Sequence, residues 1–190
     1  MVARVGVLAL QGAFDAHVQR FRALGADAFE VRTVDDLARV DAVALPGGES
    51  TTMSRLLVSS GVFDALGGLI RAGLPVFGTC AGMILLATDV LDGRPDQVGF
   101  GAIDITVRRN AYGRQVDSFE ADLSVAGLDS PFHAVFIRAP VVERAGPGVV
   151  PLATHEGRIV LAQQGAITVA SFHPELTEDV RLHARFLEEV

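Results

Sequence analysis

The chain has 190 residues, of which 49% are hydrophobic; this is enough for one folded domain with a sizeable core and excludes a disordered chain. The formal net charge of −7 argues against nucleic acid or an anionic membrane as the main partner. The single cysteine excludes an intrachain disulfide and fits a reducing compartment, so we expect a cytoplasmic protein.

The first part of the chain alternates predicted strands and helices. Residues 5–10 form a continuous apolar run, which is typical of a strand buried on both faces and is too short to cross a bilayer. Apolar residues recur at helical spacing over 14–24, and a strand at 28–32, a helix at 35–39 and a strand at 42–45 follow. This order predicts a parallel sheet with helices on both faces.

A glycine-rich turn follows the third predicted strand, in the segment Leu45-Pro46-Gly47-Gly48-Glu49-Ser50-Thr51-Thr52. A helix is expected to begin near Thr51 or Thr52, with Ser50 and Thr51 as candidate N-caps. Paired glycines let backbone N–H groups approach an oxyanion or a carboxylate, although a tight turn without a ligand explains the pattern equally well. No Gly-Lys-Ser/Thr follows, so the turn is not a phosphate-binding P-loop.

The only cysteine lies in a predicted strand-to-helix turn, Pro75-Val76-Phe77-Gly78-Thr79-Cys80-Ala81-Gly82-Met83, which follows helical patterning at 53–59 and 63–72. Small neighbours suit a strained turn of this kind, where bulky side chains would clash. The helix expected from Ala81 to about Val90 directs free N–H groups at Cys80 and favours the nucleophilic thiolate. A lone cysteine is more often a small buried hydrophobe, so this segment leaves both interpretations open.

Beyond about residue 93, short segments alternate apolar and polar residues between turns. Strands are expected at 98–108, 118–125, 134–139, 149–154, 159–164 and 167–172, mostly in antiparallel hairpins, with an exposed loop at 110–114. A closing helix over 178–189 would bury Val180, Leu182, Phe186 and Leu187. We expect one domain, 1–190, of a three-layer, flavodoxin-like α/β class: a mixed, mainly parallel central sheet flanked by helices, with an antiparallel β extension in the second half.

His173 and Glu175 lie two residues apart where the last predicted strand ends, so their side chains point to one face. A histidine that abstracts a thiol proton needs a second group to fix its tautomer, and a carboxylate can do this. A solvated strand end is the commoner explanation of such a pair taken by itself. Because the carboxyl ends of parallel strands meet at one sheet edge, Cys80 and His173 could nevertheless converge.

The remaining histidines fit ordinary structural positions: His17 and His183 in helices, His133 after a turn and His155 at a hairpin tip. None forms a metal-ligand pattern with a second histidine or cysteine, and Cys80 with His173 alone does not make a zinc site. We therefore expect no metal and no cofactor.

Gly78-Thr79-Cys80-Ala81-Gly82 with a distant His173-Pro174-Glu175 resembles the class I, triad-type glutamine amidotransferases. Further motifs are similar to those of the glutaminase subunit of pyridoxal 5'-phosphate synthase: Leu10-Gln11-Gly12, Leu45 to Thr52, Arg109-Asn110, Gly113-Arg114-Gln115-Val116-Asp117-Ser118-Phe119-Glu120, Phe136-Ile137-Arg138-Ala139-Pro140 and Ser171 to Thr177. The similarity covers essentially the whole chain, with no departure at a motif position.

The resemblance implies a role for each matching residue. Cys80 would be the nucleophile, His173 the general base and acid, and Glu175 the orienting carboxylate. Glutamine would be held by Gly47, Gly48, Glu49, Arg109, Ile137 and Arg138, with either arginine able to pair with its α-carboxylate. Backbone donors at Gly48 and Ala81 would form the oxyanion hole, and Gln11 would lie near the active site and the partner interface.

The implied activity is hydrolysis of L-glutamine to L-glutamate and ammonia through a γ-glutamyl thioester. In this family the ammonia goes to a separate synthase subunit, in a large hetero-oligomer, for the synthesis of pyridoxal 5'-phosphate, which is vitamin B6.

Two alternatives stand beside this interpretation. One is another cysteine hydrolase with a nucleophile elbow, such as a relative of the α/β-hydrolases, although there the carboxylate precedes the histidine in the chain. The other is a catalytically inactive binding or regulatory subunit that keeps the fold, against which the complete set of Cys80, His173 and Glu175 argues.

Overall fold

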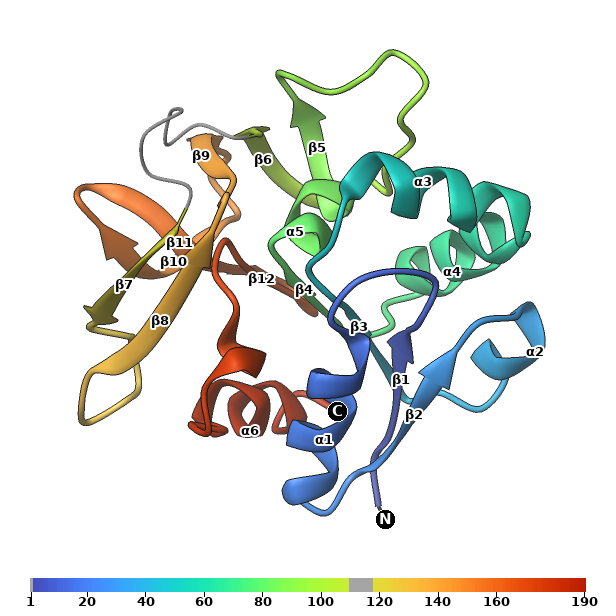
Figure 1. The fold of residues 1–190 in the computed structure, drawn as a ribbon, viewed down its shortest axis with the longest axis horizontal. Coiled ribbons are helices and arrows are strands. Elements are labelled where there is room, and N and C mark those ends of the chain that lie inside the picture. The colour runs from blue at the N-terminus through green and yellow to red at the C-terminus, as the bar shows by residue number, and fades with distance from the viewer. Residues whose placement is uncertain (1, 110–117) are drawn as a thin grey trace.

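The computed structural model describes residues 2–109 and 118–190, and its centre is a seven-stranded sheet in the order β10-β11-β12-β4-β3-β1-β2 (Figure 1). The strands are β1 (Arg4–Leu8), β2 (Asp27–Val31), β3 (Ala42–Leu45), β4 (Val76–Thr79), β10 (Val150–His155), β11 (Arg158–Gln164) and β12 (Ile167–Ala170). The five strands from β12 to β2 are parallel, whereas β11 and β10 add antiparallel strands at one edge. The predicted mixed, mainly parallel sheet is confirmed.

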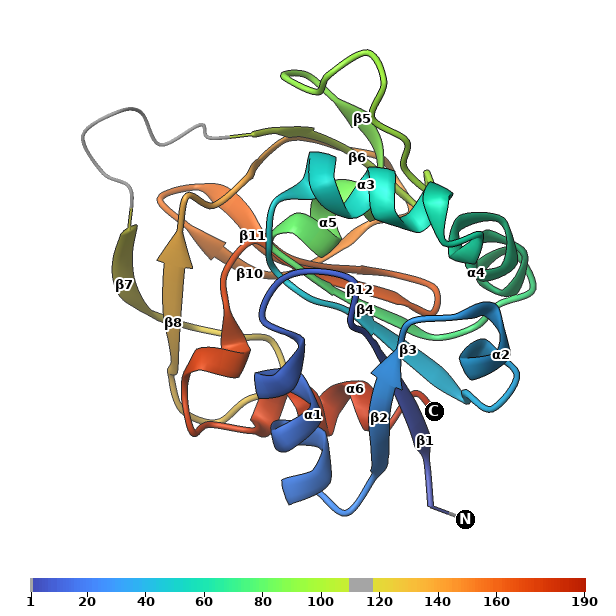
Figure 2. The ribbon, with the colours of Figure 1, turned by 45° about the vertical axis from the view of Figure 1, so that its right-hand side comes forward.

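Helices cover both faces of this sheet (Figures 1 and 2). One face carries α2 (Val34–Leu37), α3 (Ser50–Ser59), α4 (Val62–Arg71) and α5 (Ala81–Leu86), and the other carries α1 (Phe14–Ala23) and α6 (Arg181–Leu187). Successive residues of a strand point to opposite faces, so Val43 joins the first hydrophobic core and Ala44 the second. The sheet therefore separates two cores, which gives the expected three layers.

The remaining strands form the β extension predicted for the second half. A three-stranded sheet contains β5 (Ala87–Val90), β6 (Ile103–Arg108) and β9 (Val141–Ala145), and a two-stranded hairpin contains β7 (Ser118–Leu123) and β8 (Phe132–Ile137). All of these pairs are antiparallel except β5 with β6, which are parallel. The hairpin packs against the same core as α1 and α6.

Two predicted elements around residue 90 were wrong. The helix after Cys80 ends at Leu86 rather than near Val90, and residues 87–90 form β5 instead. The strand expected at 98–108 begins only at Ile103, because the N–H groups of Phe100 and Ala102 donate to the last carbonyls of α5. β9 was not predicted at all, and the loop expected at 110–114 lies outside the described residues.

The helices α3 and α6 also begin at other residues than predicted. The N-cap of α3 is Glu49 rather than Ser50 or Thr51, because the Glu49 carboxylate accepts the N–H groups of Thr51 and Thr52. The closing helix begins at Arg181, after a 3₁₀ turn over Pro174–Leu176, and buries Leu182 and Phe186 but only half-buries Val180 and Leu187.

Within the described ranges, no helix alone has the length and apolar character needed to cross a membrane. The bent pair Ser50–Ser59 and Val62–Arg71, which turns through 99°, meets that requirement by length and composition only.

Glycines allow the backbones of β4, α5 and β3 to meet at the turn that carries Cys80. A Cβ added to Gly82 would collide with the carbonyl of Leu45 in β3, and one added to Gly78 would collide with the Leu86 side chain. The small residues around Cys80 are therefore needed for packing between layers.

We expect Gly82→Ala to lower the free energy of unfolding by about 1–3 kcal/mol, because the added methyl overpacks the contact with β3. Urea unfolding measures this. The control is Gly68→Ala in α4, where no atom lies within 4 Å of the added Cβ and alanine is favoured by about 0.5–1 kcal/mol. Equal stability of the two variants would contradict the packing argument.

Candidate active site

The backbone at Cys80 has a conformation that residues other than glycine rarely adopt, with φ 49° and ψ −102°. Hydrogen bonds fix it from both sides: the Cys80 N–H donates to the carbonyl of Ala170 at 2.8 Å, and the Cys80 carbonyl accepts from Ile84 at 3.2 Å. The side chain is nearly buried, with the residue 7% exposed. The predicted strand-to-helix elbow is therefore present and strained.

Parallel pairing of β4 with β12 brings the second half of the candidate triad to this elbow. Thr79 pairs with Ala170 at the carboxyl ends of the two strands, so the residues that follow each strand leave the sheet at one edge. The N–H of His173 donates to the carbonyl of Val135 at 2.8 Å, and His173 lines the same pocket as Cys80. Glu175, in the 3₁₀ turn, accepts from His173 Nδ1 at 2.7 Å.

Charge rather than burial controls the protonation of this pair. Burial alone would lower the pKa of His173, but its hydrogen bonds with Cys80 and Glu175, and their charges, raise this pKa to about 10. Burial would likewise raise the pKa of Glu175, yet the neighbouring His17 and the hydrogen bond from His173 lower it. These shifts favour an imidazolium at His173 beside an ionised Glu175.

A pocket of about 270 Å³ opens above the thiol. Its lining comes from six separate parts of the chain: Gln11, Gly48, Glu49, Ser50, Cys80, Ile84, Arg109, Ile137, Arg138 and His173. The structure thus brings most of the residues singled out from the sequence to one cavity. Glu175 lies behind His173, and Gly47 and Ala81 are adjacent to lining residues.

The Gly-Gly turn packs directly against the catalytic candidates. A Cβ on Gly47 would collide with the His173 ring, and one on Gly12, whose φ is 98°, would collide with the Gly47 carbonyl. That carbonyl accepts from the Ala13 N–H at 3.0 Å, and the Glu49 N–H donates to Gln11 Oε1 at 2.9 Å. Gln11 and the start of α1 therefore set the shape of this turn.

Opposite charges meet at the mouth of the pocket. Arg109 Nη2 lies 3.2 Å from Glu49 Oε1, and Arg109 Nη1 also donates to Thr51 and Gln97. Burial would raise the pKa of Glu49, but hydrogen bonds from Thr52 and Thr51 lower it to about 2, so this carboxylate is ionised. Arg138 is exposed and makes no hydrogen bond or ion pair with any residue that the structure describes.

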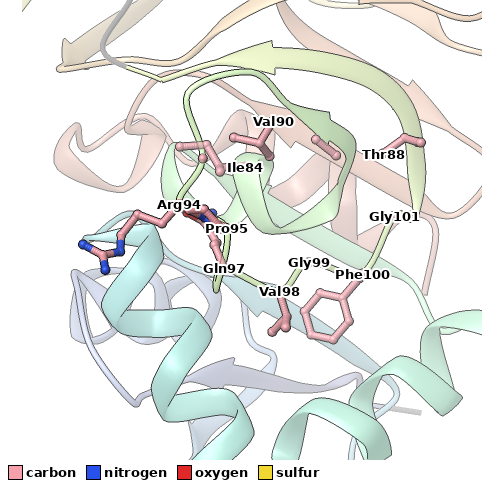
Figure 3. Close-up of a pocket in the computed structure, with 12 residues that line it drawn as sticks. Ile84, Thr88, Val90, Arg94, Pro95, Gln97, Val98, Gly99, Phe100 and Gly101 are labelled. Atoms are coloured by element: carbon pink, nitrogen blue, oxygen red, sulfur yellow. The ribbon is translucent and has the colours of Figure 1, made fainter.

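A larger pocket of about 440 Å³ adjoins this site (Figure 3). It shares Ile84 with the smaller pocket, and its wall includes Gln97, which accepts a hydrogen bond from Arg109. None of Cys80, His173 or Glu175 lines it. Across residues 2–109 and 118–190, no group of three or more His, Cys, Asp or Glu side chains could hold a metal ion.

One residue beside the candidate triad was not identified from the sequence. His17, treated there as an ordinary helical histidine, is fully buried, and its Nε2 lies 3.3 Å from Glu175 Oε2. It follows Phe14 by three residues and precedes Phe21 by four, so it sits on the apolar stripe of α1. A polar side chain on such a stripe needs a buried partner, and this is the signal that could have identified it.

Comparisons with known proteins agree with this geometry. The SNO glutamine amidotransferase family matches residues 7–190. Similar curated proteins are the pyridoxal 5'-phosphate synthase subunit PdxT of Parafrankia sp. (strain EAN1pec), 57% identical over 98% of this chain and 93% of that protein, and of Deinococcus radiodurans, 56% identical over 96% and 95%.

Solved structures show the same relationship. A crystal structure described as a glutamine amidotransferase is 50% identical, covers 97% of both chains and superposes with a TM-score of 0.92. The structure of PurLQS from Thermotoga maritima, at 16% identity and a TM-score of 0.65 over 99% of both chains, shares the fold.

The strain at Cys80 predicts an unusual order of stabilities. We expect the free energy of unfolding of Cys80→Gly to exceed that of Cys80→Ala by about 1 kcal/mol. Glycine avoids a backbone strain of roughly 1–3 kcal/mol in the folded state. Its greater conformational freedom in the unfolded state offsets about 0.5–1 kcal/mol of this gain. Chemical denaturation of both variants measures this difference. The same substitutions at Thr79, inside β4, should give the opposite order, and the absence of any inversion would rule out strain at the elbow.

Proposed function

The chain belongs to the SNO glutamine amidotransferase family, and we propose that it is the glutaminase subunit of a pyridoxal 5'-phosphate synthase, acting as a single domain over residues 1–190. It hydrolyses L-glutamine to L-glutamate and ammonia and supplies the ammonia to a synthase subunit for vitamin B6 synthesis. The family resemblance drawn from the sequence is confirmed. The observation that supports the mechanism is that Cys80 and His173 line one pocket with paired charges at its mouth, while Glu175 accepts a hydrogen bond from His173.

The reaction follows from these three side chains. The Cys80 thiolate attacks the side-chain amide carbon of glutamine and forms a tetrahedral intermediate. The protonated His173 gives its proton to the leaving nitrogen, so that ammonia departs and a γ-glutamyl thioester remains. His173, now neutral, takes a proton from water as the water attacks the thioester, and the second tetrahedral intermediate releases glutamate and the thiolate.

Backbone donors are available for the oxyanion of each intermediate. Ala81 is the first residue of α5, so its N–H has no partner within the helix and lies next to the thiol. The Gly47 carbonyl is bound by Ala13, so in a trans peptide the Gly48 N–H points away from α1. We assign both groups to the oxyanion hole, where loss of one donor typically costs about 3 kcal/mol.

The charges at the pocket mouth suit the other end of the substrate. Free glutamine carries an α-ammonium and an α-carboxylate on one carbon, and Glu49 and Arg109 present the two complementary charges side by side. Arg138 supplies a second cation, Gly48 and Ile137 complete the wall, and Gly47 adjoins it. Glu49 and Arg109 therefore favour binding of a free amino acid over an amide that carries no charge.

Ammonia explains why a partner is needed. In water it would protonate, lose its nucleophilicity and diffuse away, so direct delivery to the synthase subunit preserves it. We place the contact with that subunit near Gln11, which touches the Gly-Gly turn. The assembly proposed is a large cytoplasmic hetero-oligomer without nucleic acid or membrane.

An inactive regulatory subunit with the same fold is the remaining alternative. We expect the protein, mixed with its synthase subunit, to release glutamate from glutamine, and Cys80→Ala to abolish the release, because no other described side chain can form the thioester. A coupled glutamate assay measures it. His173→Asn should retain less than about 1% of the activity, since general acid–base catalysis contributes roughly 10²–10⁴-fold.

Size measurement of the mixture shows whether each variant still joins the assembly, so that lost activity is not confused with lost binding. Wild-type glutamate release in Cys80→Ala would refute the thiolate mechanism, and no release by the wild-type mixture would favour the regulatory alternative.

A second prediction concerns recognition of the zwitterion. Arg109→Met should raise the KM for glutamine about tenfold or more, because a hydrogen bond to a charged group contributes about 1.5–3 kcal/mol, and should change kcat less. Initial rates at varied glutamine concentration measure both constants. Arg55→Met is the control, since Arg55 lies on α3, forms an ion pair with Asp96 and does not line the pocket. An unchanged KM in Arg109→Met would exclude Arg109 from substrate binding.

A further inference from the structure

The carboxylate of Glu175 is held between two imidazoles. Its Oε1 accepts from His173 Nδ1 at 2.7 Å, and its Oε2 lies 3.3 Å from Nε2 of His17 in α1. We propose that His17 is a positioning residue for the reaction: it holds Glu175 from behind and so fixes the orientation and charge of His173. The inference rests on the proposed function, because it assigns a role in the same active site.

Burial makes this contact important. The side chains of His17 and Glu175 are both fully buried, so water cannot satisfy the second carboxylate oxygen. Oε2 has no hydrogen bond of good geometry among the described residues, and His17 is the basic group beside it. A buried carboxylate that lacks a donor on one oxygen is costly, and without His17 it could rotate away from His173 or take up a proton.

The surroundings of His17 select one tautomer. Glu175 is ionised and can only accept, so a proton on His17 Nε2 is favoured, and Thr79 Oγ1 at 3.1 Å lies beside the same nitrogen. His17 Nδ1 is then an acceptor and lies 3.0 Å from Nε2 of His183 in α6, which can donate to it. His183 therefore orients His17 as His17 orients Glu175.

Burial disfavours the charged form of both supporting histidines. Burial lowers the pKa of His17, with Glu175 opposing and His173 adding to this effect, and burial also lowers the pKa of His183, with His17 and Arg20 adding to it. Arg20 donates to the Glu175 backbone carbonyl at 3.3 Å. A neutral imidazole beside Oε2 leaves the charge of Glu175 uncancelled, so Glu175 still stabilises the imidazolium of His173.

The test uses three substitutions at position 17 in the assembled complex with the synthase subunit. His17→Gln places an amide N–H near the original Nε2, His17→Asn places one near the original Nδ1, and His17→Leu removes both. Phe21→Leu is the matched control, because Phe21 packs against the His17 ring in the same core but has no polar atom.

We expect His17→Leu to lower kcat about 10- to 100-fold with little change in KM, as misplacement of a catalytic group does. The alkaline limb of the pH profile of kcat/KM should move down by about one unit, since His173 loses part of the charge that holds its proton. Alkylation of Cys80 by iodoacetamide at neutral pH should slow in parallel. His17→Gln should recover most of these values and His17→Asn should not.

If His17→Leu does not fold, the difference in kcat, pH profile and alkylation rate between His17→Gln and His17→Asn is sufficient to test the proposal. Equal losses in these two variants, or a pH profile unchanged from wild type in every folded variant, would overturn the proposal and leave His17 a packing residue like Phe21. Failure of the proposed function is distinguishable, because then wild type and Phe21→Leu would also release no glutamate.

Discussion

The parallel pairing of β4 with β12 is the constraint on which the rest of the site depends. It places Cys80 and the segment from Ser171 to Glu175 at one edge of the sheet, although they come from opposite halves of the chain. The hydrogen bond from the Cys80 N–H to Ala170 continues this pairing into the turn itself. The strained conformation at Cys80 can persist because strand pairing on one side and α5 on the other both fix it.

Five polar side chains of the candidate site are shielded from water. Cys80, His173, Glu175, His17 and His183 follow one another from the pocket into the core, and each is nearly or fully buried. In that environment every charge depends on the neighbour that compensates it, so the order of groups matters more than any one of them. The pocket mouth differs, because the side chains of Glu49 and Arg109 remain partly exposed and form an ion pair there.

Local patterns were sufficient for the parallel half of the fold, because strands buried on both faces are continuous apolar runs and the elbow is marked by small residues. They failed at residues 87–102, where hydrogen bonds between Phe100 and the end of α5 decide where strand and helix stop. They failed again at His17, whose partner Glu175 comes from the far end of the chain. The candidate triad could be proposed from the sequence because Cys80, His173 and Glu175 stand in short motifs, whereas His17 and His183 are brought beside them only by the fold.

The pocket lies between elements that pack in two different hydrophobic cores. Cys80 leads into α5, which packs in one core, while the turn that carries Glu175 contacts α1 and β8, which pack in the other. Cys80 and His173 are therefore attached to different layers of the molecule, with the sheet between these layers. In the proposed mechanism, a displacement of one layer relative to the other changes the separation of thiol and imidazole while the packing within each core stays the same, so activity depends on the alignment of the two layers.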